Sequence, residues 1–327
     1  MNSHQKFKKD AKNIAFDLKH RETIRFNISR YNAAVSKGKA RYKNIEVARN
    51  YTAFQKKKML NQWDKYLCEF EENASKNGIT VLWAKDQTQA IEYFQEILKE
   101  NQAKLLVKSK SMTTEEINLN QAAKDVNCEA LETDLGEFIV QIAGERPYHI
   151  VTPAMHKSKK DIADLFHEKY QLPKESTPEE ITLFVRNLLR TKYKTADIGV
   201  TGANFLIADI GGIALTENEG NALMTTAFPR IHISIAGIEK LIPSINDLGI
   251  YWPLLACMGT GQQITAYNSI ITGPKKNKEK DGPEKMYLIL LDNGRTELYQ
   301  DQDAKEALAC IRCGACLNAC PVYKTIG

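Results

Sequence analysis

The chain has 327 residues and a formal net charge of +5, with 43% hydrophobic and 26% charged residues. This composition is ordinary for a soluble globular protein and excludes a disordered or collagen-like chain. The length suggests about two domains, which is enough to bury a core without disulfide bonds. The seven cysteines are far too few for a disulfide scaffold.

The sequence gives no sign of a membrane segment or a secretion signal. No apolar run reaches the ~18 residues that a membrane-spanning helix requires, and the basic start leads into no apolar stretch. We therefore expect no transmembrane segment and a cytoplasmic protein. In that reducing compartment cysteines are more often metal ligands or free thiols than disulfides.

The first 60 residues form a basic arm, with 16 Lys and Arg against 4 Asp and Glu. Such an arm could attract nucleic acid, an anionic membrane or an acidic partner, or it could be the solvated face of helices. It carries no zinc-finger or RNA-recognition signature, so we expect no nucleic-acid ligand. Apolar spacing predicts helices over residues 44–75, packed on the body or a partner with the lysines outside. The apolar stripe comprises Val47, Tyr51, Phe54, Met59, Trp63, Tyr66, Phe70 and Ala74.

After this arm (residues 1–75), the pattern changes to strands that alternate with helices up to about residue 300. Short apolar runs predict strands at 78–83, 104–107, 212–216, 231–235 and 286–291. The alternation predicts an α/β fold whose sheet has helices on both faces.

Polar residues gather after two of the predicted turns and strands. Glu217, Asn218, Glu219 and Asn221 follow one strand. The turn formed by Thr201, Gly202 and Asn204 could present backbone N–H groups to an anion. One interpretation is a pocket for a small anion or a docking partner; the other is that turns simply require Gly and Asn. Neither NAD nor ATP binding is predicted, because both Gly-rich fingerprints are absent from the sequence.

The last segment, residues 301–327, contains four cysteines with the spacing C-x2-C-x2-C-x3-C-P: Cys310, Cys313, Cys316 and Cys320 before Pro321. This spacing is typical of a [4Fe–4S] cluster, and three thiolates two residues apart can bind three corners of one cube. Zinc sites usually split into two pairs about 15–20 residues apart. In two-cluster ferredoxins the fourth cysteine of such a run binds the other cluster, so the fourth ligand of this cluster stays open.

The remaining cysteines, Cys68, Cys128 and Cys257, stand alone in the sequence. A lone cysteine is commonly a small buried apolar residue. We therefore expect all three to be buried and to bind no metal.

Several long strings of the chain resemble the lactate-utilisation protein B family: residues 108–120, 132–158, 201–222, 231–244, 260–275 and 310–323. The resemblance runs from about residue 20 to the end. It implies a lactate-utilisation domain over residues 76–300, similar to the sugar-phosphate isomerase and CoA-transferase folds. It also implies a non-catalytic iron–sulfur electron-transfer subunit of a complex that oxidises L-lactate to pyruvate, with companion proteins of the A and C types.

Family members carry two [4Fe–4S] clusters. By resemblance, Cys310, Cys313 and Cys316 match ligands of the first cluster and Cys320 a ligand of the second, whose other cysteines this sequence lacks. Two other functions remain open. One is a CoA-transferase-like enzyme with Glu217 or Glu219 as nucleophile and the turn at residues 201–204 as oxyanion donor. The other is a nucleic-acid binder that acts through the basic arm.

Overall fold

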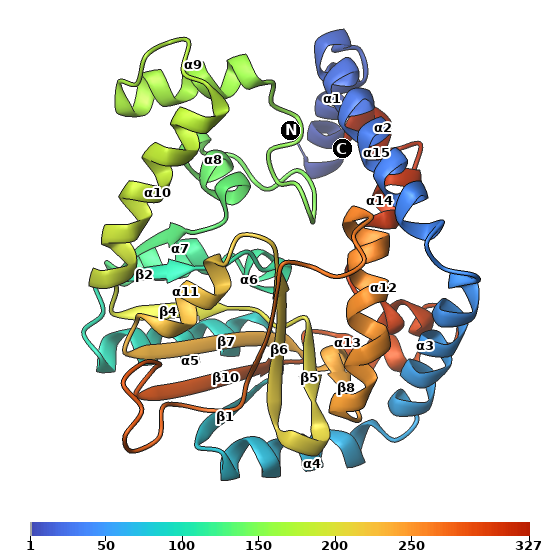
Figure 1. Cartoon of the computed structure of the whole chain (residues 1–327), viewed down its shortest axis with the longest axis vertical. Helices are drawn as coiled ribbons and strands as arrows, with labels where there is room; N and C mark the ends of the chain where they lie inside the picture. The colour runs from blue at the N-terminus through green and yellow to red at the C-terminus, as the bar shows by residue number, and fades with distance from the viewer. Residues whose placement is uncertain (1) are drawn as a thin grey trace.

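The computed structural model describes residues 2–327 and contains two sheets (Figure 1). The larger sheet is parallel throughout, in the order β1-β10-β7-β4-β2-β3. All five predicted strands form, each within two residues of its expected ends, and the α/β class is confirmed. The larger sheet consists of β1 (Ile79–Ala84), β2 (Leu105–Lys108), β3 (Glu129–Glu132), β4 (Ile198–Thr201), β7 (Ile231–Gly237) and β10 (Lys285–Leu291).

The smaller sheet has four strands in the order β8-β5-β6-β9 and is mostly antiparallel. Of this sheet, the sequence predicted only the longest strand, at 212–216. The strands are β5 (Phe205–Ile207), β6 (Gly212–Glu217), β8 (Leu241–Ile242) and β9 (Tyr267–Ile271).

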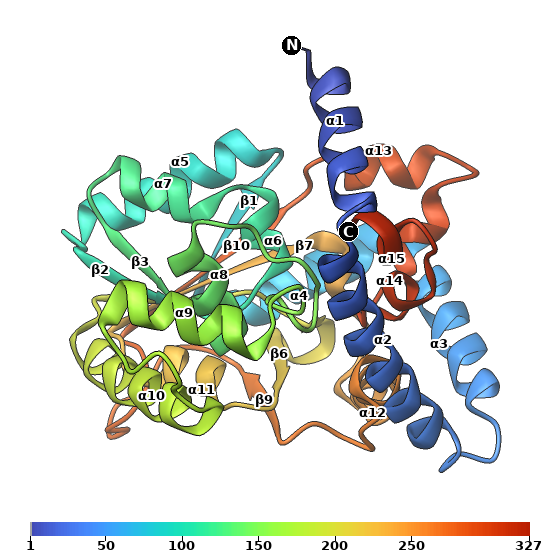
Figure 2. The ribbon, with the colours of Figure 1, turned by 90° about the horizontal axis from the view of Figure 1, so that it is seen from above.

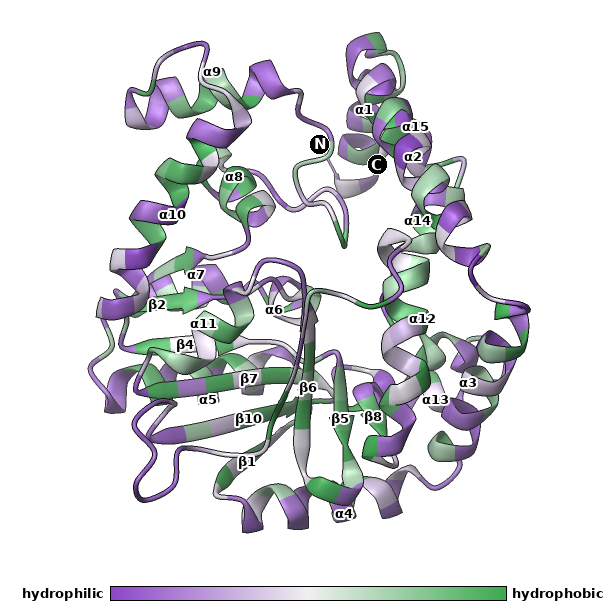
Figure 3. Cartoon of the chain, viewed as in Figure 1, coloured by the Kyte–Doolittle hydropathy of each residue, from purple (hydrophilic) through white to green (hydrophobic). Residues whose placement is uncertain are grey.

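Helices cover both faces of the larger sheet, as predicted (Figure 2). Successive strand residues face opposite sides: Leu106 packs with α5 (Gln87–Glu100) and α7 (Leu119–Asp125), whereas Val107 packs with the helices of the other face. Because both faces are buried, the central strands are almost wholly apolar (Figure 3). The helices of the other face are α8 (Leu135–Ala143), α9 (Lys159–Tyr170), α10 (Pro178–Thr195) and α11 (Asn221–Ala227).

The basic arm is helical, as predicted for residues 44–75. Its buried side contributes Met59, Trp63, Phe70 and Ala74 to a core shared with β1, β10 and the smaller sheet. Among residues 2–327, no helix combines the length and the apolar character that crossing a membrane requires. The arm consists of α1 (Ser3–Ala15), α2 (Leu18–Lys39), α3 (Ile45–Leu60) and α4 (Trp63–Lys76).

For the first three residues of the predicted apolar stripe, the prediction of burial is wrong. Val47 and Phe54 are each 62% exposed, and Tyr51 is 49% exposed. The side of α3 that faces inward carries Lys56 instead, at 2% exposure. The Lys56 ammonium donates hydrogen bonds to the carbonyl oxygens of Glu239 and Leu241. The helix is therefore oriented by a lysine that the sequence analysis expected on the solvent side.

The arm meets the body where α2 packs on α12 (Leu248–Thr260). The two backbones approach each other at Gly38 and Gly261, and a Cβ on Gly38 would lie 2.6 Å from the Gly261 carbonyl oxygen. Gly261 also has φ of +73°, a conformation that favours glycine. The remaining helices are α6 (Met112–Glu116), α13 (Arg295–Gln300), α14 (Ala315–Ala319) and α15 (Tyr323–Ile326).

We expect Gly38→Ala to destabilise the protein, because the added methyl group forces α2 away from α12. Thermal unfolding should show a loss of roughly 1–3 kcal/mol, the usual cost of overpacking. Gly249→Ala is the matched control in α12: a Cβ there meets no atom within 4 Å, and the change should be neutral or slightly stabilising. Equal losses in both variants would contradict the close helix contact.

Candidate functional site

A cavity of about 250 Å³ lies at the carboxyl ends of the parallel strands. The winding of the sheet reverses here, since the chain runs from β2 outward to β3 and then returns to β4 on the other side of β2. Open α/β sheets place ligands at such a switch point. The loops after β2 (residues 109–113) and β4 (residues 202–204) both line the cavity.

The structure brings together six of the seven predicted pocket residues. Thr201 is the exception: it is fully buried, and its hydroxyl lies 2.8 Å from Nε2 of His232. The other predicted pocket residues line the cavity: Gly202, Asn204, Glu217, Asn218, Glu219 and Asn221. Asp134, which follows a likely strand end in the sequence, also lines the cavity, whereas sequence reasoning missed Ser109, Lys110, Ser111, Thr113, Lys240 and Arg312. The alternation of Lys and Ser directly after a predicted strand was the available signal.

The two glutamates of the cavity are engaged by backbone groups. The Glu217 carboxylate accepts hydrogen bonds from the N–H groups of Ala222 and Leu223 at 2.7 and 2.8 Å. The Glu219 carboxylate accepts one from Leu135 N–H at 3.3 Å. Burial raises the pKa of both carboxyl groups, and these backbone donors oppose the rise. Both side chains therefore fix the first turns of α11 and α8.

The cations of the cavity differ in their partners. The Lys110 ammonium donates to the Val151 carbonyl at 2.9 Å and lies 3.6 Å from Asp134. Lys240 is 6% exposed, and its ammonium has no hydrogen bond or ion pair to any group within residues 2–327. Burial lowers the pKa of Lys240 to about 8, although the Glu239 carboxylate opposes this effect.

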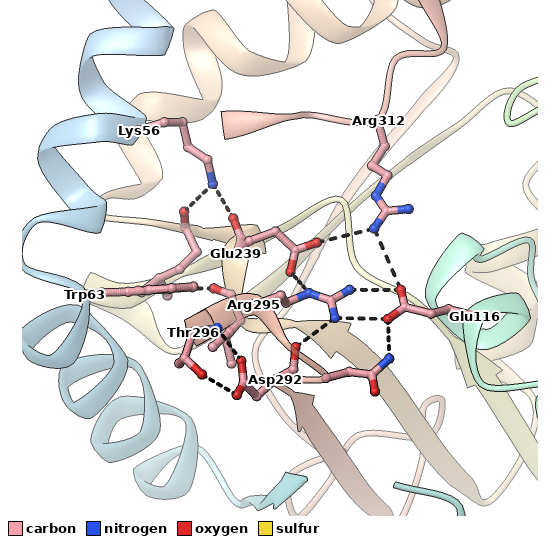
Figure 4. A network of polar contacts seen from close by, with 11 residues as sticks. Lys56, Trp63, Glu116, Glu239, Asp292, Arg295, Thr296 and Arg312 are labelled. Atoms are coloured by element: carbon pink, nitrogen blue, oxygen red, sulfur yellow. Dashed lines mark hydrogen bonds and ion pairs between the residues drawn. The ribbon is translucent and has the colours of Figure 1, made fainter. Parts of the chain in front are cut away.

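Arg312 connects the cysteine run to the body (Figure 4). Its guanidinium lies 3.7 Å from the Glu239 carboxylate and 3.9 Å from that of Glu116. Arg295 donates to both of these carboxylates. The segment between the first two cysteines is thus held by two buried or half-buried acids of the α/β body.

The backbone of the cysteine loop (residues 310–316) turns tightly. Arg312 and Gly314 adopt φ of +60° and +78°, and a Cβ on Gly314 would meet His149 and Val151 at 3.3 Å. The Arg312 N–H points at the Cys310 Sγ at 3.3 Å. Burial raises the pKa of Cys313, with the Ala315 N–H opposing and the nearby Cys310 and Cys316 thiols adding to the rise. The thiols of Cys310 and Cys316 thus lie near enough to Cys313 to influence its pKa.

Cys320 packs in a different hydrophobic cluster from Cys313. It packs beside Tyr148 and Leu317 under α2, and its Sγ accepts from Tyr323 N–H at 3.5 Å. Cys313 packs instead against the cluster of α12 and the smaller sheet. Among the isolated cysteines, Cys128 and Cys257 are buried as predicted, but the prediction for Cys68 is wrong, because it is exposed on α4.

A buried ionic cluster lies next to the cavity. The fully buried Lys108 ammonium is 2.9 Å from Glu132 and 3.1 Å from Glu115. Glu137 completes the group, and its Oε1 has no hydrogen-bond partner within residues 2–327. Burial, and then the Glu132 carboxylate, raises the pKa of Glu137 to about 8. One lysine thus faces three carboxyl groups, and burial favours the protonated form of Glu137 while it also raises the pKa of Glu132.

The fold and the cavity define an α/β protein that has a cavity at the switch point of its parallel sheet. Arg312 and Cys313 of the cysteine loop line this cavity. A model described as the LUD domain matches residues 67–291, and the chain belongs to this family. It is 44% identical to lactate utilization protein B of Shouchella clausii over 82% of this chain and 56% of that protein.

Two further relatives of the same name give similar values. The identity is 44% to the protein of Lysinibacillus sphaericus (83% of this chain, 57% of the relative) and 45% to that of Bacillus pumilus (81% and 56%). The resemblance stated from the sequence is confirmed, and the chain spans a little more than half the length of these relatives. A DUF162 family structure from Deinococcus radiodurans matches with a TM-score of 0.40 at 11% identity, over 70% of this chain and 98% of that one.

The Lys108 cluster makes stability depend on pH. Because the pKa of Glu137 rises from 4.5 to about 8 on folding, the folded state binds more protons than the unfolded state in this window, and stability falls as pH rises through it. We expect Glu137→Gln to raise the melting temperature more at pH 8.5 than at pH 5, by roughly 3 °C or more. An equal change at both pH values would show that Glu137 is not held protonated.

Proposed function

We propose that this chain is an iron–sulfur electron-transfer subunit that acts in lactate utilisation, in the oxidation of L-lactate to pyruvate. The names of its relatives support the role in lactate utilisation. The observation that supports electron transfer is the cysteine loop, whose spacing is that of [4Fe–4S] ligands.

The residues of the loop fit such a group. Cys310, Cys313 and Cys316 would hold three corners, the positive φ of Arg312 and Gly314 bends the backbone around them, and the Arg312 N–H donates toward a ligand sulfur. A [4Fe–4S] cluster supplies one-electron transfer when bound. The body contributes Arg312's carboxylate partners and the wall formed by His149 and Val151, which fix the loop in place.

The CoA-transferase alternative is less well supported by the site. A nucleophilic glutamate needs a free carboxylate oxygen directed at the substrate. The Glu217 carboxylate instead accepts two backbone N–H groups, and Glu219 accepts one. In the turn at residues 201–204, the Asn204 N–H already donates to the Ala214 carbonyl at 2.9 Å. These contacts favour a structural role for the glutamates.

We expect the cysteines to differ in their importance for the first cluster. Cys313→Ser should abolish iron and sulfide incorporation, because Cys313 lies inside the loop. Cys320→Ser should leave the content of the first cluster nearly intact, because Cys320 packs in a different hydrophobic cluster from Cys313. The measurement is iron, sulfide and electron paramagnetic resonance per chain after anaerobic purification. Equal loss in both variants would make Cys320 the fourth ligand.

We also expect the chain to work with companions of the A and C types, as the name of its relatives, lactate utilization protein B, implies. Tagged chain should co-purify with them from cells grown on lactate. Deletion of its gene should stop growth on L-lactate and spare growth on pyruvate, and the wild-type gene should restore growth where a Cys316→Ser copy does not. Normal growth of the deletion strain on L-lactate would refute the proposed function.

A further inference from the structure

Two buried hydrogen-bond donors lie beside the cysteine loop without an acceptor. His149 is 2% exposed, and its Nε2 has no hydrogen-bond partner within residues 2–327. The hydroxyl oxygen of Tyr31, on α2, is likewise buried and unpaired in the described chain. Buried polar groups are normally paired, because an unpaired one costs free energy. The two rings meet edge to face with centroids 5.7 Å apart, so both unpaired groups belong to one place in the fold.

The second nitrogen of His149 fixes the position of the ring proton. The N–H groups of Val151 and Thr152 point at Nδ1, at 3.1 and 3.3 Å. A nitrogen that accepts hydrogen bonds carries no proton, and a neutral imidazole has one N–H group, which is therefore on Nε2. Because Nε2 carries the proton, His149 is suited to donate a hydrogen bond and not to bind iron through a lone pair.

The protonated edge of His149 lies against the turn of the cysteine loop. A Cβ on Gly314 would lie 3.3 Å from Cε1 and 3.6 Å from Nε2 of His149, and Gly314 stands between Cys313 and Cys316. Burial raises the pKa of the Tyr31 phenol, and the Cys313 thiol is close enough to raise it further. Both donors therefore border the part of the loop that carries the second and third cysteines.

Asn318 on α14 is the rival acceptor for the imidazole N–H. It is 3% exposed, and it opposes the burial that lowers the pKa of His149, so its side chain lies near the ring. Nevertheless, neither Nε2 of His149 nor Oδ1 of Asn318 reaches hydrogen-bond geometry with any group of residues 2–327. The imidazole N–H is thus available to an acceptor held by the loop.

We propose that Tyr31 and His149 donate hydrogen bonds to sulfur atoms of the cluster that the loop binds, and that they thereby raise its reduction potential. The inference rests on the proposed function, since the acceptors belong to the bound cluster. Reduction adds one negative charge, which N–H and O–H donors to the sulfurs stabilise. Because Tyr31 belongs to α2, the basic arm acts on the chemistry of the cluster as well as on the packing of the body.

The test is a redox titration of the full chain, purified anaerobically with its cluster and followed by electron paramagnetic resonance of the reduced form. Tyr31→Phe and His149→Leu should each lower the ratio of reduced to oxidised cluster at a fixed solution potential roughly tenfold, which is about 59 mV for one electron. His149→Gln keeps an N–H donor and should lie closer to the wild type. Tyr170→Phe is the matched control, since Tyr170 packs on Phe138 and Phe184 in a hydrophobic cluster without cysteine-loop residues.

The metal-free chain gives a second readout. The Tyr31 hydroxyl has no protein partner, so Tyr31→Phe should leave the melting temperature of the chelator-treated chain unchanged or raise it. A lower melting temperature together with an unchanged potential of the loaded chain would give the hydroxyl a structural role and overturn the inference for Tyr31. Tyr31→Phe removes a single oxygen atom, and it decides the matter even if His149→Leu fails to fold.

The inference is overturned if iron-loaded Tyr31→Phe and His149→Leu keep the wild-type potential, in which case the imidazole N–H belongs to Asn318. It is also overturned if Tyr170→Phe shifts the potential equally. Pulsed electron paramagnetic resonance that detects a directly bound nitrogen, lost in His149→Leu, would make His149 a ligand instead of a donor. A wild-type chain that takes up no iron and sulfide refutes the proposed function and this inference with it, whereas unchanged potentials in loaded variants refute only the role of the two donors.

Discussion

One buried carboxylate, that of Glu239, connects parts of the chain that lie far apart in sequence. It accepts from Arg295 of α13 and lies 3.7 Å from Arg312 of the cysteine loop, while its backbone carbonyl accepts from Lys56 of the arm (Figure 4). Burial opposes its ionisation, but the positive charges of Arg295, Lys240 and Arg312 together hold the pKa of Glu239 below its usual range. Removing one partner of such a group leaves a buried charge uncompensated, which is strongly destabilising.

The arm, the sheet and the cysteine loop therefore depend on one another. The arm fixes the turn after β7 through Lys56 and Trp63. The pKa of Lys56 falls to about 7, because burial lowers it more than the nearby Glu239 carboxylate raises it. A helix that looks like a solvated basic surface thus contributes a lysine with altered chemistry to the interior, and its contact with the turn sets where Lys240 lies.

Local sequence predicted the long central strands, because burial on both faces leaves a continuous apolar run. It missed β3 and β4, whose four residues include Glu at both ends of one and Gly in the other. Polarity patterns also misplaced the inward side of α3. Periodicity treats every lysine as facing solvent, but Lys56 is buried and donates to two backbone carbonyls. For the site, turn residues indicated six of the lining positions. Lys240 could not be found this way, because its place in the cavity wall depends on how the turn after β7 packs in the fold.

The cavity and the cysteine loop share residues, because Arg312 and Cys313 of the loop line the cavity. Arg312 adopts a positive φ and occupies the position between Cys310 and Cys313, and its guanidinium reaches acids of the body. The backbone turn that gathers the thiols and the ion pairs that border the cavity are therefore made by the same residue. A change in loop conformation moves Arg312 relative to Glu239, and Glu239 is the neighbour of Lys240 in the chain. The thiol loop and Lys240 thus depend on the same carboxylate residue, Glu239, although 70 residues separate Lys240 from Cys310.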